Sequence, residues 1–231
     1  MMEDLDASNL FTMAPAALEG ALPERVSPAD PDEARIRLSS TRYAQIEIAV
    51  LELYRDVDAR FVPLEPLSIA QELGYGPIPY RALGAKISRL LHAASPDALT
   101  CWFWGEERPL ILFDDRKPRR RCAFTMMHEI AHARLGHREH SELAEMEANK
   151  FAAEALCPLP LLSRSGLVAP EKISEHFGVS EECARHRLDA LAKWNALPGS
   201  RRNRLFAEGV LGRFRFKIPI QGILFPAKGC G

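Results

Sequence analysis

The stretch Phe-Thr-Met-Met-His-Glu-Ile-Ala-His-Ala-Arg-Leu-Gly-His, residues 124–137, decides how the rest of this 231-residue chain is interpreted. It contains His128, Glu129 and His132 in the pattern H-E-x-x-H. Side chains four positions apart share one face of a helix, with Cβ atoms about 5–6 Å apart, so both imidazoles can bind one tetrahedral zinc ion. Glu129 is rotated by about 100° from His128 and can reach the open side of such a metal without binding it, which is where a general base belongs.

The helix is predicted independently of the motif. An apolar stripe at i, i+3, i+7 and i+11 is formed by Phe124, Met127, Ala131 and Leu135. Gly136 is placed to end the helix. A core helix with two hydrogen-bonded histidines would show the same period, because a five-residue pattern can arise by chance. A third ligand elsewhere in the chain therefore decides between a metal site and a core helix.

A second predicted helix, residues 141–156, offers that ligand. Its small apolar face is formed by Ala148, Phe151, Ala152 and Ala155. Glu145 extends this face by one turn, whereas Glu147 falls on the polar side. A carboxylate on a buried face needs a partner, and zinc is one. We predict Glu145 as the third ligand, with Glu147 as the alternative and Asn149 as a hydrogen-bond partner of a ligand.

Two histidines and one glutamate, with water in the fourth position, are the coordination of a catalytic zinc site rather than of a closed structural one. We therefore expect one zinc ion per chain, bound by His128, His132 and Glu145, with Glu129 as the catalytic residue. In the alternative interpretation Glu145 is only a solvated charge on its helix.

These two segments, in this order, resemble a known family. Residues 124–137, followed by Glu-x-x-x-Asn-x-Phe-Ala-Ala-x-x-Leu-x-Pro at 145–158, closely resemble the ImmA/IrrE family of zinc metallopeptidases over roughly residues 41–192. The resemblance implies a gluzincin-like domain and a cytoplasmic peptidase whose known members cut helix-turn-helix repressors and so relieve repression. It assigns zinc and catalysis to the same four residues. The usual Leu-Leu-Met-Pro ending is here Leu156-Cys157-Pro158.

We expect an α+β fold, mostly helical, with a small antiparallel sheet before the H-E-x-x-H helix and a C-terminal helical pair. The sheet is predicted from two β-rich runs at 99–104 and 110–113, and residues 75–80 can form only an edge strand or an extended link. Helices are predicted at 41–58, at 68–73, around 83–91 and, as the C-terminal pair, within 171–192.

Four segments follow from these elements. They are a mobile leader (1–40), a metallopeptidase core (41–160), a helical segment packed on the core (161–195) and a basic C-terminal extension (196–231). The leader could instead be an arm that docks a partner. In the extension, residues 210–216 and 218–225 alternate weakly, as in a hairpin.

The helical pair at 171–192 also resembles a DNA-binding helix-turn-helix, in which Arg185, His186 and Arg187 would face the major groove. The alternative function is therefore a regulatory protein that binds DNA or a repressor, with a structural or inactive zinc site. Against it, Glu129 is intact, and a net charge of −1 predicts no general attraction to nucleic acid. We favour packing of this pair on the core and expect a protein substrate.

The location is predicted to be cytoplasmic. Five widely spaced cysteines contain no C-x-x-C pair, so neither a disulfide framework nor a cysteine zinc site is indicated. No apolar run approaches the roughly 18 residues of a membrane-spanning helix, and the acidic N-terminus is unlike a secretory signal.

Other candidate residues have plainer interpretations. We interpret His137 and His140 as surface histidines in a charged connection, because a polar loop is a poor scaffold for a precise site. Trp102, Phe103 and Trp104 could line a substrate groove along a sheet edge, although core packing is the simpler role. His176 and Tyr80 are unassigned candidates for an oxyanion donor.

Overall fold

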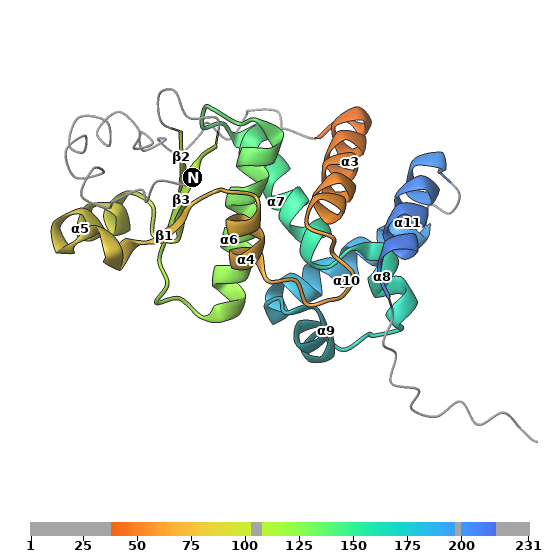
Figure 1. Ribbon diagram of the computed structural model, residues 1–231. Helices are drawn as coiled ribbons and strands as arrows, with labels where there is room; N and C mark the ends of the chain where they lie inside the picture. Colours follow the sequence, from red (N-terminus) through yellow and green to blue (C-terminus); the bar gives the residue numbers. More distant parts are fainter. Residues whose placement is uncertain (1–37, 103–107, 197–199, 216–231) are drawn as a thin grey trace, which may run out of the picture.

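The computed structural model describes residues 38–102, 108–196 and 200–215, and this part of the chain is mainly helical with one small sheet (Figure 1). The predicted α+β class is thereby confirmed. The leader up to residue 37, Phe103 and Trp104, and the strand predicted at 218–225 lie outside the described residues. The elements are α3 (Ser40–Asp56), α4 (Pro66–Glu72), β1 (Pro77–Pro79), the 3-10 helix η1 (Tyr80–Leu83), α5 (Ala85–Ala94), β2 (Ala98–Cys101), β3 (Leu110–Phe113), α6 (Arg119–Leu135), α7 (Glu142–Leu156), α8 (Leu159–Ser165), α9 (Pro170–Phe177), α10 (Glu181–Ala196) and α11 (Arg201–Arg213).

Helix α3 forms where the apolar period predicts it. The Ser39 hydroxyl accepts a hydrogen bond from the Arg42 backbone N–H at 3.2 Å and caps the first turn. The buried inner face is formed by Ile46, Val50 and Leu53. Helix α4 begins at Pro66, two residues before the Ser68 start that we predicted. Proline is well suited to the first turn, because the N–H groups there have no partner within the helix and the missing one is not needed.

The sheet is mixed, with strand order β1-β3-β2. Strands β2 and β3 pair antiparallel, as the predicted hairpin requires, with Leu99 opposite Leu112. Strand β1 pairs parallel to β3, with Ile78 opposite Leu112, so the expectation of a purely antiparallel sheet was wrong. The reason is topological: η1, α5 and β2 intervene between β1 and β3, and this crossover lets the two strands run in the same direction.

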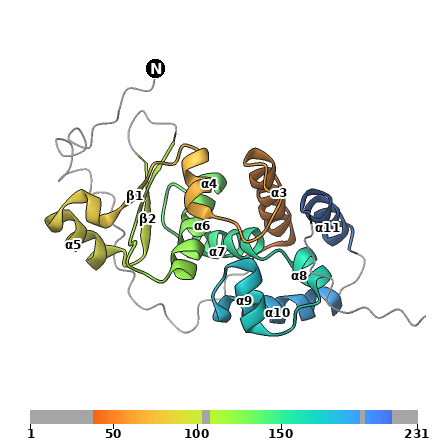
Figure 2. The ribbon, with the colours of Figure 1, turned by 60° about the horizontal axis from the view of Figure 1, so that its bottom comes forward.

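The sheet lies between α6 on one face and α5 with η1 on the other (Figure 2). Alternate residues of β3 point to opposite faces. Ile111 belongs to the main core, whereas Leu112 belongs to a smaller cluster with Tyr80, Leu91 and Cys101. Strand β2 also packs against α6, the helix that carries the H-E-x-x-H motif.

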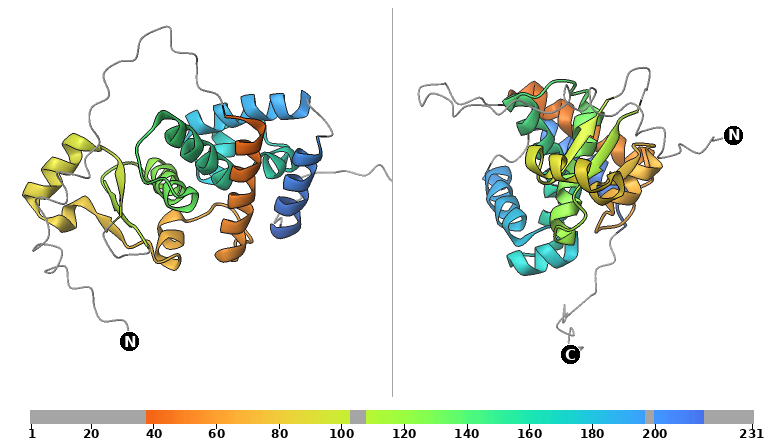
Figure 3. Two further views of the ribbon diagram at one scale, coloured as in Figure 1. Left: turned by 90° about the horizontal axis from the view of Figure 1, so that it is seen from above. Right: turned by 90° about the vertical axis from the view of Figure 1, so that its left-hand side faces the viewer.

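Helices α6 and α7 pack side by side at the centre of the molecule, and α3 lies against α7 (Figure 1). Helix α10 packs against α8 and α9, and α3 and α11 lie together at the end opposite α5 (Figure 3). In the described part of the chain, no helix combines the length and the apolar character needed to cross a membrane.

Residues 210–213 belong to helix α11 rather than to the strand that we predicted. Phe206 and Val210, one turn apart, are buried and join the main core, and α11 contacts α3 and α8. A Cβ on Gly209 would lie 2.8 Å from the Leu51 side chain, so a glycine is what allows α11 to approach α3. Burial of a helical face therefore outweighed the weak period-two pattern of this segment.

Candidate metal centre

The H-E-x-x-H motif lies in the C-terminal half of helix α6. Met127, Ile130 and Ala131 are buried in the core, and this fixes the rotation of the helix. His128 and His132 then share the neighbouring face, with ring centroids 4.7 Å apart. Gly136, with φ +71°, ends the helix in the left-handed conformation that glycine adopts most readily, as predicted.

Three donor groups converge between α6 and α7. His128, His132 and Glu145 each offer a ligand atom, and these atoms all lie within 4.8 Å of one another. The two Nε2 atoms are 3.0 Å apart, and the Glu145 oxygens lie 3.2 Å from His128 Nε2 and 3.3 Å from His132 Nε2. Corners of a tetrahedron about 2.1 Å from its centre are about 3.4 Å apart. The donor set therefore fits a zinc ion in both chemistry and spacing.

The burial of the two candidate glutamates is the reverse of what we predicted. Glu145, which meets the histidines, has a side chain 34% exposed, whereas Glu147 is 1% exposed. Glu147 faces Arg42 of α3 and His137, and its carboxylate is not part of the three-residue cluster. The buried stripe of α7 runs through Ala144, Glu147, Ala148 and Phe151.

Glu129 lies beside the donor set without joining it. Its residue is 7% exposed, and Thr100 of β2 donates a 2.6 Å hydrogen bond from its hydroxyl to Glu129 Oε2. Thr100 was not among the predicted site residues. Only the packing of β2 on α6 brings residues 100 and 129 together, so no local pattern could have identified this contact.

Each histidine has a second partner at its other ring nitrogen. His128 Nδ1 lies 3.1 Å from Asn149 Oδ1, as the predicted role of Asn149 requires. His132 Nδ1 lies 3.1 Å from His137 Nδ1, and His137 Nε2 lies 3.0 Å from Glu147 Oε2. Such outer partners fix the tautomer and the orientation of a ligand histidine.

His137 is therefore not the surface histidine that we predicted, since its side chain is only 9% exposed. The turn at Gly136 brings it back over the last turn of α6, where its backbone N–H donates to the His132 carbonyl at 2.9 Å. Burial lowers the pKa of His137, although Glu147 opposes this shift. The Leu-Gly-His ending of the motif was the signal that could have placed this ring against His132.

Electrostatics keep both carboxylates ionised. Hydrogen bonds from His128 and His132 hold the pKa of Glu145 far below its ordinary value. Burial raises the pKa of Glu147, but the hydrogen bonds and charges of Arg42 and His137 together outweigh it, so the net pKa is lowered. An ionised carboxylate at Glu145 is the form that binds a metal.

The remaining candidate residues, His140, Trp102, Tyr80 and His176, have separate surroundings. His140 is half-exposed, as predicted, yet its Nδ1 lies 3.3 Å from Glu145 Oε1. The Arg138 guanidinium lies 3.6 Å from the centre of the Trp102 ring. Tyr80 is a buried core residue whose hydroxyl donates a hydrogen bond to the Ser95 carbonyl, and the His176 ring makes an edge-to-face contact with its neighbour Phe177 in α9.

The helix-turn-helix interpretation of α9 and α10 fails at Arg187. This side chain is 4% exposed and donates to both oxygens of Glu154, at 3.1 and 2.7 Å, and to the Cys157 carbonyl. It holds α10 against the end of α7 and cannot face a groove of DNA. Arg185 is exposed, and its guanidinium pairs with Glu181 one turn earlier.

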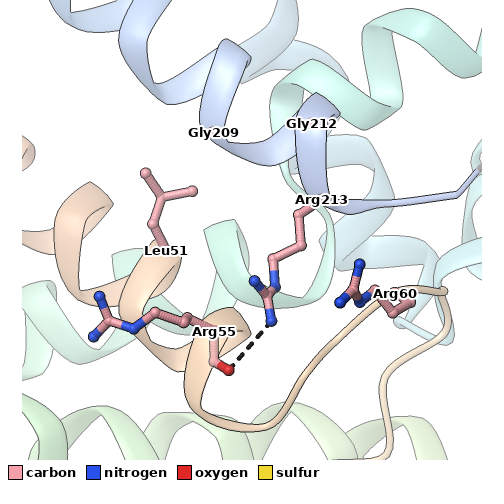
Figure 4. Close-up of a pocket in the computed structure, with 6 residues that line it drawn as sticks. All are labelled: Leu51, Arg55, Arg60, Gly209, Gly212 and Arg213. Carbon is pink, nitrogen blue, oxygen red and sulfur yellow. Dashed lines mark hydrogen bonds between the residues drawn. The ribbon is translucent and has the colours of Figure 1, made fainter.

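A pocket between α3 and α11 is lined by Leu51, Arg55, Arg60, Gly209, Gly212 and Arg213 (Figure 4). Arg213 donates to the carbonyls of Tyr54 and Arg55 at the end of α3 and pairs with Asp58. It thus acts as a cap for the helix. None of the six lining residues is a histidine, a cysteine or a carboxylate, so they offer none of the side chains that usually bind zinc.

Comparison with protein families identifies the same region. Residues 80–189 match the model of the IrrE N-terminal-like domain, a peptidase family, and this confirms the resemblance predicted from the two motifs. The match includes α6 and α7 and excludes α3 and α11. No curated protein matches the chain.

Proposed function

We propose that this protein, whose residues 80–189 match the IrrE N-terminal-like family of peptidases, is a zinc-dependent endopeptidase that uses His128, His132 and Glu145 as ligands and Glu129 as general base. The observation that carries the proposal is the separation of roles within one helical turn of α6. Two histidines converge with Glu145 at 3.0–3.3 Å, while Glu129 is held outside this set by Thr100. A closed structural site has no use for such a carboxylate.

When bound, a zinc ion supplies an activated water molecule and polarises the peptide carbonyl. Glu129 accepts the proton of the attacking water and then delivers it to the leaving amine. The Thr100 hydroxyl fixes Glu129 Oε2 and leaves the other oxygen, Oε1, for this transfer. Asn149 and His137 hold the ligand rings in place.

The position of β2 suggests how a substrate is presented. This strand is an outer member of the described sheet and carries Thr100 against Glu129. An extended peptide that adds to the outer edge of β2 would pass the general base, with main-chain hydrogen bonds supplying affinity. We propose a helix-turn-helix repressor as the protein substrate, in line with the family resemblance, and a cytoplasmic site of action.

The test combines metal content with cleavage. Purified protein, offered zinc and then dialysed, is expected to retain one zinc ion per chain and to cut a helix-turn-helix repressor encoded beside its gene. Glu129→Gln should retain zinc and lose at least about 10²-fold in cleavage rate, because a general base contributes about 10²–10⁴-fold. Glu142→Gln, an exposed change on α7, is the matched control.

Undiminished cleavage by Glu129→Gln would overturn the mechanism. Cleavage of a mixed peptide library without cleavage of the repressor would retain the peptidase and reject the repressor as its substrate. Absence of zinc from the wild-type protein would reject the metal site itself.

A further inference from the structure

The contacts behind His132 differ from those behind His128. His128 meets the neutral amide of Asn149, whereas His132 is the first member of a chain that continues through His137 and Glu147 to Arg42. We propose that Arg42, Glu147 and His137 form a positioning relay that fixes the tautomer of His132 and presents its Nε2 lone pair to the metal. The inference rests on the proposed function and assigns Glu147, the alternative ligand of the sequence analysis, a different task.

The direction of the relay follows from its acceptor end. An ionised carboxylate can only accept hydrogen bonds, so His137 Nε2 must carry the proton that it shares with Glu147 Oε2 at 3.0 Å. In a neutral imidazole the other nitrogen, Nδ1, is then an acceptor. His132 Nδ1, 3.1 Å away, must be the donor to it, so a neutral His132, the form that binds a metal, carries its lone pair on Nε2. His132 Nε2 is the atom that faces Glu145 and His128.

Arg42 keeps the acceptor end ionised. Its Nε and Nη2 atoms donate to the two oxygens of Glu147, both at 2.5 Å, in the paired geometry that suits guanidinium and carboxylate. The Glu147 side chain is 1% exposed, so without this cation its charge would be strongly disfavoured. Ser39 caps the turn that carries Arg42, and Gln45 accepts from Arg42 Nη1 at 3.1 Å.

The relay also joins α3 to the metal site. Arg42 lies outside residues 80–189, which match the family model, whereas His137 and Glu147 lie within them. His137 is held at three points: its backbone N–H donates to the His132 carbonyl, and its ring is fixed through Nδ1 and Nε2. A ring fixed in this way is suited to orienting a neighbour and, being 9% exposed, poorly suited to surface chemistry.

The test measures metal affinity in the full chain by competition with a chromophoric zinc chelator. Glu147→Gln and His137→Phe should each raise the zinc Kd by about 10–100-fold, which is the usual effect of losing an outer partner of a ligand. Glu142→Gln, the same type of change on the exposed side of α7, should leave the Kd within about twofold. Arg42→Gln should also raise the zinc Kd, because it removes the cation that keeps Glu147 ionised. The Arg42 side chain is 44% exposed and touches no ligand, so this change leaves the donor set itself untouched.

Cobalt substitution supplies a readout that a loss of stability alone would not change. In cobalt-loaded protein, Glu147→Gln and His137→Phe should shift the visible absorption bands, since these report the ligand field at His132, while Glu142→Gln should not. Wild-type protein that binds zinc, with both relay variants inside twofold and with unshifted cobalt spectra, would overturn the relay and leave the proposed peptidase intact. Wild-type protein that binds no zinc would instead overturn the proposed function, and the relay with it.

Discussion

Helix α7 carries two buried glutamates whose surroundings differ. Glu147, near its start, and Glu154, near its end, are each 1% exposed. The chain of contacts from Glu147 leads through His137 to a candidate metal ligand. Glu154 is enclosed by Arg187 and Lys150, and its Arg187 partner donates to the Cys157 carbonyl at the end of the same helix.

The difference shows that burial of a charge does not by itself reveal its role. Glu154 belongs to a network that ends on backbone and joins α10 to α7. Glu147 belongs to a network that ends on the imidazole of His132, whose Nε2 atom faces His128 and Glu145. Disruption of the Glu154 network should therefore reduce stability, and disruption of the Glu147 network should reduce metal affinity.

Arg187→Ala should have the largest effect on stability. It leaves Glu154 buried with Lys150 as its remaining cation, and removing one partner of a buried ion pair costs about 3–5 kcal/mol. We expect the free energy of unfolding, measured in urea, to decrease by an amount near the lower end of that range, because Lys150 remains. Arg185→Ala, on the exposed face of the same helix, should change it by less than about 0.5 kcal/mol. Equal losses in both variants would contradict the structural role of Arg187.

Acid should weaken the Glu154 network selectively. Burial disfavours its ionisation, but Arg187 and Lys150 outweigh this and lower the pKa of Glu154 from 4.5 to about 2. A carboxyl whose folded pKa is depressed stabilises the fold above its unfolded pKa, and this stabilisation, about 3 kcal/mol, is lost as the pH falls from about 4.5 to about 2.

Thermal unfolding across that acid range gives the measurement. The decline in Tm with falling pH should be shallower in Glu154→Gln than in wild type, because the variant has no proton to bind at this position. Glu142→Gln should follow wild type. Parallel curves for wild type and Glu154→Gln would show that Glu154 is not the titrating group.

Zinc should stabilise only a protein with an intact Glu145. A ligand that binds only the folded state, present at 100 times its Kd, raises the free energy of unfolding by about 2.7 kcal/mol. We expect this gain in wild type and in Glu154→Gln, and its loss in Glu145→Ala, measured by thermal unfolding with zinc and with chelator. An equal gain in Glu145→Ala would place the bound metal elsewhere in the chain.

Local sequence predicted much of the fold. The apolar periods located α3, α6 and α7, and Gly136 marked the end of α6, because these features depend on contacts within one helix. The spacing of the H-E-x-x-H motif placed two histidines on one face for the same reason. The parallel pairing of β1 and the helix at 201–213 were missed, because both depend on segments distant in sequence.

The surroundings of Glu145 and Glu147 depend on contacts beyond their own helix. A single amphipathic stripe predicts one buried face, but α7 packs against both α6 and α3, so two faces are covered. Glu145 meets the histidines from the more exposed position, and Glu147 is the buried carboxylate. Glu145 does lie in the cluster, as predicted, but the burial from which it was predicted belongs to Glu147 instead.

The sequence by itself therefore predicted helices α3, α6 and α7, the two histidines on one face of α6 and the resemblance to the family, since each is set by residues within a few turns of one another or by a motif pair. Only the tertiary structure decided that Thr100 holds Glu129, that His137 returns to His132 and that Arg42 supports Glu147. These contacts join residues up to 105 positions apart, and only the packing of β2 and α3 around the α6–α7 pair brings their distant members together.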